Sequence, residues 1–356
     1  MDAEIIIIGG GVIGCATAWA LTRDIAGRDI LIIERGEIGR EASWAGGGIL
    51  SPLLPWDYSE AVTRLTLSAM HAYPGWVDSL KACGGVDPEY RRTGMLVFPP
   101  CDPAQARAWA TAHGMTVELG GSDQGATAQP VLWLPDVAQV RNPRLMQALS
   151  KALRGKGVGI REHTEMLGFL RNGDRVEGIS TSQGILRARH VIVAGGAWSA
   201  GVLKAYGPAL DIRPVRGQML LFKLAPDVLP HILYRDGLYL IPRSDGHLLV
   251  GSTLEDAGFD KTTTQAAARA LHEAATALAP ILAEVTPIAH WAGLRPGSPG
   301  NVPTIARHPE IANLYVNGGH FRYGVTMAPM AARLMRNLLI EAAQPFDMAP
   351  YRWPSW

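Results

Sequence analysis

The sequence predicts an α/β protein in which a doubly wound domain with a buried parallel sheet carries an inserted α+β domain with an antiparallel sheet. Three observations support this fold class. A strand, glycine turn, helix and second strand fill residues 4–35, buried strands ending in glycine recur near residues 193 and 316, and alternating strand patterns occur within residues 213–251. The 356 residues suffice for two domains of ordinary size.

Composition and charge exclude several classes of protein. The 33 basic and 32 acidic residues give a formal net charge of +1, without a long run of either sign, so we expect no nucleic acid and no anionic membrane as partner. Cys15, Cys83 and Cys101 have neither the number nor the spacing of a disulfide framework or zinc site, so no metal is expected. No membrane span of about 20 apolar residues is present, and we expect a cytoplasmic protein.

The first glycine cluster lies at the turn of the βαβ pattern. Gly9, Gly11 and Gly14 fill G-x-G-x-x-G after the apolar run at residues 5–8. Such glycines allow a tight turn, let the backbone approach a pyrophosphate and let the helix pack on the strand. Glu34 ends the second strand, where a carboxylate can accept ribose hydroxyls. The pattern predicts dinucleotide binding, with a purely structural turn as the alternative, but it does not separate NAD from FAD.

Three later segments favour FAD. Residues 43–50 contain three consecutive glycines, which let a flat ring system lie close to the backbone; a plain interdomain hinge is the alternative. Residues 190–196 form a buried strand that ends in two glycines. Residues 314–324 form a strand and glycine loop before a helix predicted over 325–341, whose positive N-terminus suits the anionic end of a reduced flavin.

Together with residues 291–297, these motifs resemble the D-amino-acid-oxidase superfamily of FAD enzymes, and within it the glycine oxidase family of thiamine biosynthesis. The likeness covers essentially the whole chain. It implies a Rossmann-like domain of the glutathione-reductase type that binds FAD. Because the nearest Cys to the C-terminal flavin loop in sequence is Cys101, we expect FAD to bind without a covalent link. The cofactor-binding residues expected from the likeness are Gly9, Gly11, Val12, Ile13, Gly14, Glu34, Arg35, Ala42, Ser43, Gly46, Gly47, Gly48, Ile49, Met166, Ala194, Gly195, Trp198, Gly319, His320, Phe321, Arg322, Tyr323, Gly324, Val325 and Thr326.

Both domains are predicted to be discontinuous. The alternation in residues 218–223, 239–242 and 247–251 predicts antiparallel strands, and residues 265–278 an Ala-rich helix. The FAD-binding domain is predicted to comprise residues 1–51, 141–212 and 290–356, and the substrate-binding domain residues 52–140 and 213–289. The tail over residues 345–356 is expected to pack onto the body or onto another subunit.

The substrate side is expected to hold a carboxylate next to a flavin, which requires a paired charge. Arg295 lies between Gly and Pro residues and, by the resemblance, clamps this carboxylate; a surface arginine is the alternative. The resemblance also implies that Tyr239 donates its hydroxyl to the carboxylate and that Arg322 lies at the substrate or its entry. Ile49 and Leu254 stand where glycine oxidases often have Met, and both are expected to line the substrate pocket.

The reaction implied is dehydrogenation of glycine, sarcosine or a small D-amino acid by hydride transfer to flavin N5. Dioxygen then forms hydrogen peroxide, and the imine is hydrolysed or supplies the thiazole moiety of thiamine. No residue is expected to act as an obligatory acid or base, and His320 is interpreted as a structural residue of the flavin loop. A sarcosine oxidase, a D-amino-acid oxidase, a quinone-linked dehydrogenase and a non-catalytic FAD-binding assembly protein remain alternatives. The resemblance further implies a homo-oligomer, commonly a homotetramer.

Overall fold

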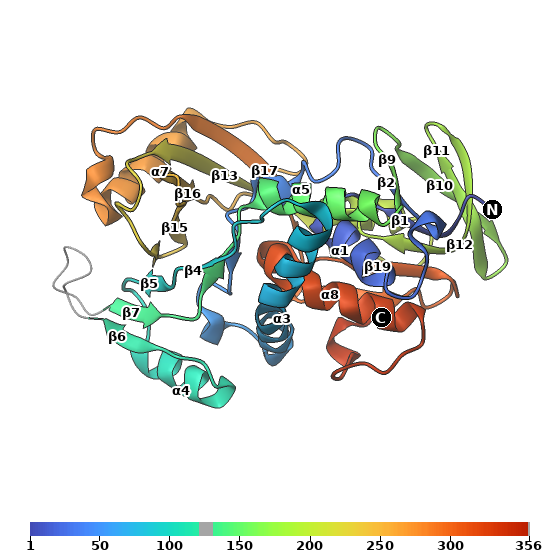
Figure 1. The fold of residues 1–356 in the computed structure, drawn as a ribbon, viewed down its shortest axis with the longest axis horizontal. Helices are drawn as coiled ribbons and strands as arrows, with labels where there is room; N and C mark the ends of the chain where they lie inside the picture. The colour runs from blue at the N-terminus through green and yellow to red at the C-terminus, as the bar shows by residue number, and fades with distance from the viewer. Residues whose placement is uncertain (121–130, 355–356) are drawn as a thin grey trace.

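The computed structural model describes residues 1–120 and 131–354, and two large sheets dominate it. Figure 1 shows the sheet that contains β1, β2 and β10–β12 at one end of the molecule and the sheet that contains β13, β15 and β16 at the other. The predicted α/β class with a second, antiparallel sheet is confirmed.

The first sheet has eight strands, in the order β10-β11-β12-β1-β2-β9, with β19 pairing with β12 and β18 with β19. Its strands are β1 (Ala3–Ile8), β2 (Ile30–Ile33), β9 (Gly159–Arg161), β10 (Met166–Asn172), β11 (Arg175–Thr181), β12 (Gly184–Val193), β18 (Thr304–Arg307) and β19 (Leu314–Gly318). β1, β2, β9, β12 and β19 pair in parallel.

The isoleucine run of β1 explains why this strand is central. Ile5 and Ile7 belong to the core on one face of the sheet, and Ile6 and Ile8 to the core on the other. A parallel strand buried on both faces requires such a continuous apolar run. The register aligns Ile8 with Ile33 and Val193, so the carboxyl ends of β1, β2 and β12 meet at one edge, where open α/β sheets bind ligands.

Helices α1, α3, α5 and α8 pack on one another beside this sheet. The helices are α1 (Val12–Leu21), α2 (Ala42–Ala45), α3 (Glu60–Gly84), α4 (Pro103–His113), α5 (Asn142–Gly155), α6 (Ser199–Leu203), α7 (Gln265–Leu278) and α8 (Gly324–Leu339). The helices predicted over 265–278 and 325–341 correspond to α7 and α8. In the described part of the chain, no helix combines the length and apolar character needed to cross a membrane.

The second sheet has the order β17-β13-β16-β15-β14-β5-β7-β6, and all its pairs are antiparallel except β14 with β5. Its strands are β5 (Met95–Val97), β6 (Glu118–Gly120), β7 (Val131–Leu134), β13 (Arg213–Lys223), β14 (Ile232–Arg235), β15 (Leu238–Pro242), β16 (His247–Gly251) and β17 (Ala289–Gly297). β17 pairs with β13 along nine residues. The predicted boundary between residues 289 and 290 therefore falls inside this strand, directly after its first residue. The division into domains stays a prediction.

A small third sheet joins distant parts of the chain. It consists of β3 (Ile49–Leu50), β8 (Ala138–Gln139) and β4 (Arg91–Arg92), in the order β3-β8-β4. The second glycine cluster consists of Gly46, Gly47 and Gly48. Because β3 directly follows this cluster, the small sheet fixes where the cluster lies.

The C-terminal tail packs onto the body as far as residue 354. Trp353 is buried, its Nε1 donates a hydrogen bond to the carbonyl of Pro208 at 3.1 Å, and its ring lies edge-on to His308. Trp356 lies outside the described residues.

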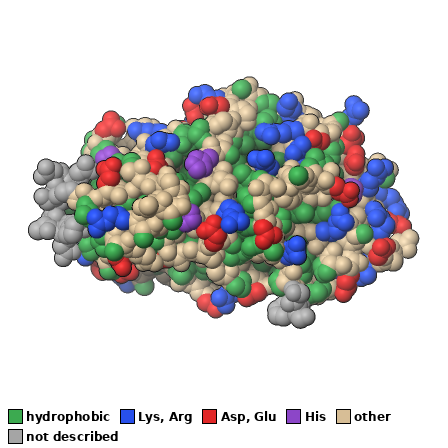
Figure 2. Space-filling model, turned by 90° about the horizontal axis from the view of Figure 1, so that it is seen from below, with side chains coloured by type: hydrophobic (Ala, Val, Ile, Leu, Met, Phe, Trp, Pro, Cys, Tyr) green, Lys and Arg blue, Asp and Glu red, His purple; other side chains and the backbone are tan. Residues whose placement is uncertain are grey.

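Basic and acidic side chains intermingle on the face shown in Figure 2. Neither sign dominates there, in keeping with the balanced composition.

Candidate active site

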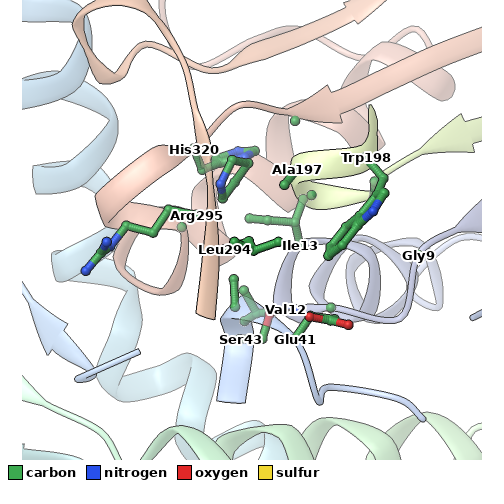
Figure 3. Close-up of a pocket in the computed structure, with 18 of the residues that line it drawn as sticks. Gly9, Val12, Ile13, Glu41, Ser43, Ala197, Trp198, Leu294, Arg295 and His320 are labelled. Carbon is green, nitrogen blue, oxygen red and sulfur yellow. Dashed lines mark hydrogen bonds between the residues drawn. The ribbon is translucent and has the colours of Figure 1, made fainter. Parts of the chain in front are cut away.

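A cavity of about 860 Å³ lies at the carboxyl edge of the first sheet and extends to the second sheet. All the predicted cofactor-binding residues line it except Gly14 and Thr326. Arg295, Tyr239 and Ile49 line it as well. Figure 3 shows Trp198 and Glu41 on one side of this cavity and Arg295 on the opposite side. The structure thus brings together segments from residue 8 to residue 325.

At the end of the cavity beside β1 and β2, Glu34 is held by the backbone. Its Oε2 accepts a hydrogen bond from the N–H of Gly10 at 2.8 Å, and its Oε1 accepts one from the N–H of Gly36 at 3.0 Å. Gly9 has φ +112°, and a Cβ there would lie 2.4 Å from the carbonyl oxygen of Ala194. A Cβ on Gly14 would lie 2.0 Å from the oxygen of Gly9, so Gly14 allows helix α1 to pack close to the turn. Gly14 therefore contributes to packing behind the cavity wall and does not line the cavity.

A cation–π contact that the sequence does not reveal lies at the same end. The guanidinium of Arg35 lies 3.6 Å from the centre of the Trp198 ring, and its Nη2 forms an ion pair with Glu41 at 3.2 Å. A loop from the substrate side reaches this point, where Phe259 stacks on Trp198 and Lys261 pairs with Glu41 at 3.0 Å. Glu41 lines the cavity but was not predicted as a site residue.

At the opposite end, Arg295 of β17 donates hydrogen bonds to neutral acceptors alone in the described part of the chain. Its Nη1 donates to the carbonyl of Thr253 at 3.3 Å, and its Nη2 donates to Oγ of Ser252. Gly217, on the neighbouring strand β13, leaves the room for this side chain, because a Cβ there would lie 2.2 Å from Nη1. Burial lowers the pKa of Arg295, and Tyr239 partly opposes this shift.

Tyr239 and Arg322 complete this end. The hydroxyl of Tyr239 donates to Sδ of Met219 at 3.4 Å. Burial alone would lower the pKa of Arg322, but the surrounding tyrosines, Tyr323 foremost, raise it above the ordinary value. Within residues 1–120 and 131–354, no carboxylate forms an ion pair with Arg295 or Arg322. The end therefore carries two guanidiniums without a counterion, a charge pattern suited to an anionic ligand.

The structure differs from the prediction at two further positions. Leu254 is 57% exposed and does not line the cavity. Its neighbours point inward instead: Thr253 Oγ1 accepts the N–H of Gln218, and Glu255 pairs with Arg216, so the intervening side chain faces outward. Thr326 lies behind the wall, where its hydroxyl donates to the carbonyl of Ile49 at 3.1 Å.

His320 is fully buried in the cavity wall, and burial lowers its pKa to about 3. Its imidazole is therefore neutral at pH 7, and its Nε2 has no hydrogen-bond partner among the residues that the structure describes.

Unpartnered buried polar atoms show that the cavity fits a polar cofactor. Besides His320 Nε2, both amide atoms of Asn142 and Oδ1 of Asn317 lack partners within residues 1–120 and 131–354, and all three residues line the cavity. Buried polar atoms normally have partners, so these positions call for a ligand that forms hydrogen bonds. With the glycine-lined edge and Glu34, the residues present fit a flavin dinucleotide. Asn142 was not predicted; only its place before Pro143 at the start of a helix distinguishes it in the sequence.

Comparison with known proteins identifies relatives along the whole chain. A family model described as FAD dependent oxidoreductase matches residues 4–338. A glycine oxidase of Pseudomonas putida is 43% identical over 360 residues, which cover 99% of this chain and 98% of that protein. A bifunctional protein ThiO/ThiG of Trichormus variabilis is 30% identical over 96% of this chain and 53% of its own length.

Solved structures agree with this relationship. The crystal structure of glycine oxidase from Geobacillus kaustophilus matches with a TM-score of 0.91 and 25% identity, covering 98% of this chain and 97% of that one. The chain therefore belongs to the DAO family of FAD-dependent oxidoreductases, as its glycine motifs and the residues around Arg295 predicted.

Proposed function

We propose that this chain is an FAD-dependent amino-acid oxidase that oxidatively deaminates glycine and other small amino acids, including sarcosine and small D-amino acids. The observation that carries the proposal is the pair Arg295 and Arg322, which face the cavity without a carboxylate partner among the described residues. The identity of 43% to a glycine oxidase over nearly the full length supports the same substrate class.

FAD is proposed to bind without a covalent link. Glu34 would accept the ribose hydroxyls, and the glycines of residues 46–48 and 318–319 would let the flavin ring approach the backbone. None of the three cysteines, all of which the structure describes, lines the cavity.

The substrate is proposed to be oriented by its carboxylate. Arg295 offers a planar fork of N–H donors, and the Tyr239 hydroxyl lies beside it. Bound FAD supplies the hydride acceptor and the subsequent reaction with dioxygen to hydrogen peroxide.

The amine has to be neutral when hydride leaves the α-carbon. Burial away from water disfavours the charged ammonium form, and the positive charges of Arg295 and Arg322 disfavour it further. The site therefore promotes loss of the proton to solvent by its environment, and an obligatory base is not needed. Neutral His320 is proposed to hold the wall of the cavity in place.

The glycine imine is proposed to supply the thiazole moiety of thiamine, as the family resemblance implied. A cytoplasmic location stays a prediction from the cysteine pattern and the absence of a long apolar stretch in the sequence, and a homotetramer stays a prediction from the resemblance.

A peroxide assay with glycine, sarcosine and D-alanine tests the proposal on FAD-loaded protein. Peroxide formation with glycine is expected, and acid precipitation should release the flavin into the supernatant. Dye reduction without peroxide would instead indicate a dehydrogenase. Neither peroxide nor dye reduction with any of the three amines would favour a non-catalytic FAD-binding protein.

A further inference from the structure

Arg243, which follows strand β15, is a buried cation that contacts the back of the cavity wall. It is 5% exposed. Its Nη2 donates to the carbonyl of Gly47 at 2.8 Å, and its Nη1 donates to the carbonyl of Val140 at 2.9 Å and to Oε1 of Gln139 at 2.5 Å. Gly47 lines the cavity, whereas Arg243 does not. Arg243 thus stands one peptide group behind the cavity surface.

These contacts fix the second glycine cluster from behind. The N–H of Val140 donates to the carbonyl of Gly48 at 2.9 Å, so the same short segment that accepts from Arg243 also holds the next glycine. A Cβ on Gly47 would lie 2.5 Å from Cδ1 of Ile241, so the loop presses directly on β15. One guanidinium therefore connects the glycine loop, β8 and the end of β15, across as many as 196 residues of sequence.

No carboxylate of the described residues contacts the guanidinium of Arg243 directly. All three acceptors are neutral, and the nearby carboxylates of Glu89 and Asp245 bind Arg141 instead, at 3.3 and 2.8 Å. Burial, with a smaller contribution from Arg141, lowers the pKa of Arg243 to about 10, so it remains a cation at pH 7. Glu89 and Asp245 partly oppose this lowering, so Arg243 belongs to a cluster of charges of both signs, and its guanidinium is the group of this cluster that hydrogen-bonds to Gly47 in the cavity wall.

We propose that Arg243 is a positioning residue for the bound flavin, which fixes the carbonyl of Gly47 and raises the reduction potential of FAD through its positive charge. This inference rests on the proposed function, because it requires FAD in this cavity. Reduction places negative charge on the flavin ring, and a cation behind the wall stabilises that charge.

Two variants separate the charge from the contacts. Arg243→Met removes both, and we expect the equilibrium constant for two-electron reduction to fall about tenfold, which corresponds to about 30 mV in the potential measured with reference dyes. Arg243→Lys keeps the charge but lacks the planar fork, so the potential should stay near the wild-type value while FAD binds about fivefold more weakly. As a control, Gln139→Leu removes one acceptor without changing the charge, and its potential should not move.

Equal potentials in wild type and Arg243→Met would overturn the inference. If Arg243→Met does not fold, Arg243→Lys decides: FAD affinity equal to that of wild type overturns the positioning role, and weaker binding at unchanged potential supports it. The measurements are made on purified FAD-loaded protein by absorbance. A wild-type protein that binds no FAD would refute the proposed function itself, whereas FAD binding with unaltered variants refutes only the role of Arg243.

Discussion

At one end of the cavity a carboxylate, Glu34, receives backbone N–H groups, whereas at the other end two guanidiniums, Arg295 and Arg322, have no carboxylate partner in the described residues. The first end is centred on parallel strands and on the βαβ unit that holds Glu34, and Trp198 and Phe259 reach it from distant segments. The second is built where an antiparallel strand meets the loop that follows β19. The end that we propose for the nucleotide thus has its carboxylate hydrogen-bonded by the protein itself, whereas the end that we propose for the substrate carries two guanidiniums for an anionic ligand to pair with.

The largest effect on activity is expected when Arg295, at the end proposed for the substrate, is replaced. Arg295→Met should lower kcat/KM for glycine about 1000-fold, because losing one partner of a buried charge pair costs about 3–5 kcal/mol. Flavin content, measured by absorbance, should stay unchanged. Arg40→Met, at an exposed arginine that pairs with Glu37, is the control. Wild-type saturation kinetics in Arg295→Met would refute the carboxylate clamp.

The nucleotide end is tested at Glu34. Glu34→Gln should weaken FAD binding by about 10- to 100-fold, because hydrogen bonds to a charged group are worth about 1.5–3 kcal/mol. The KM for glycine of the fully loaded variant should change little. Titration with FAD, followed by flavin fluorescence, measures the effect, and exposed Glu37→Gln provides the comparison. Equal FAD affinities in the two variants would contradict the ribose contact.

Gly217→Ala tests the space that the substrate end requires. The added methyl group would displace the guanidinium of Arg295, the flexible end of that side chain, from the position in which it faces the cavity. We expect KM for glycine to rise about tenfold without loss of flavin. Gly75→Ala is the matched control, since a Cβ there meets nothing within 4 Å. An unchanged KM would show that Arg295 does not need its present position.

Tyr239→Phe should have a smaller effect. Loss of a hydrogen bond worth about 1 kcal/mol predicts a decrease of about fivefold in kcat/KM for glycine. Steady-state peroxide assays measure it, with Tyr90→Phe as a control outside the cavity lining. No difference between the two variants would remove Tyr239 from the substrate contacts.

The smallest effect on activity is expected at His320. Its pKa of about 3 in the folded protein lies below the ordinary 6.5, so the imidazole stays neutral at the near-neutral pH values of an activity assay. His320→Asn should therefore leave the midpoints of the pH profile of kcat/KM unchanged. Because protonation opposes folding, wild type should lose the stability due to neutral His320 as pH falls from about 6.5 towards 3, and the variant should lose less. A shifted profile in the variant would show that His320 titrates during turnover.

The residues that we propose for the nucleotide could be singled out from the sequence because their signal is local. Gly9, Gly11 and Glu34 lie within one βαβ unit, and their spacing follows from the turn they form. Arg295 could be singled out because Gly and Pro residues flank it, a setting that is unusual for a solvated arginine on the surface of a helix.

The features that escaped prediction depend on contacts between distant segments. Asn142, Gly217 and Arg243 acquire their roles from residues that are up to 196 positions away, and no local pattern marks them. Leu254 was placed in the pocket, but the residues on either side of it turn inward and leave it exposed. Leu254 lies beyond the end of β16, where tertiary contacts and not strand alternation decide which side chains face the cavity.

The order in which the strands pair has a consequence for biosynthesis. β13 pairs with β17, which follows it by more than 60 residues, and β12 pairs with β19, more than 100 residues later. Neither large sheet can be completed while the last fifth of the chain is still on the ribosome, and pairings this distant in sequence form slowly. The unfinished chain will expose strand edges during translation, so capture by chaperones and a supply of cofactor late in synthesis should raise the yield of folded enzyme.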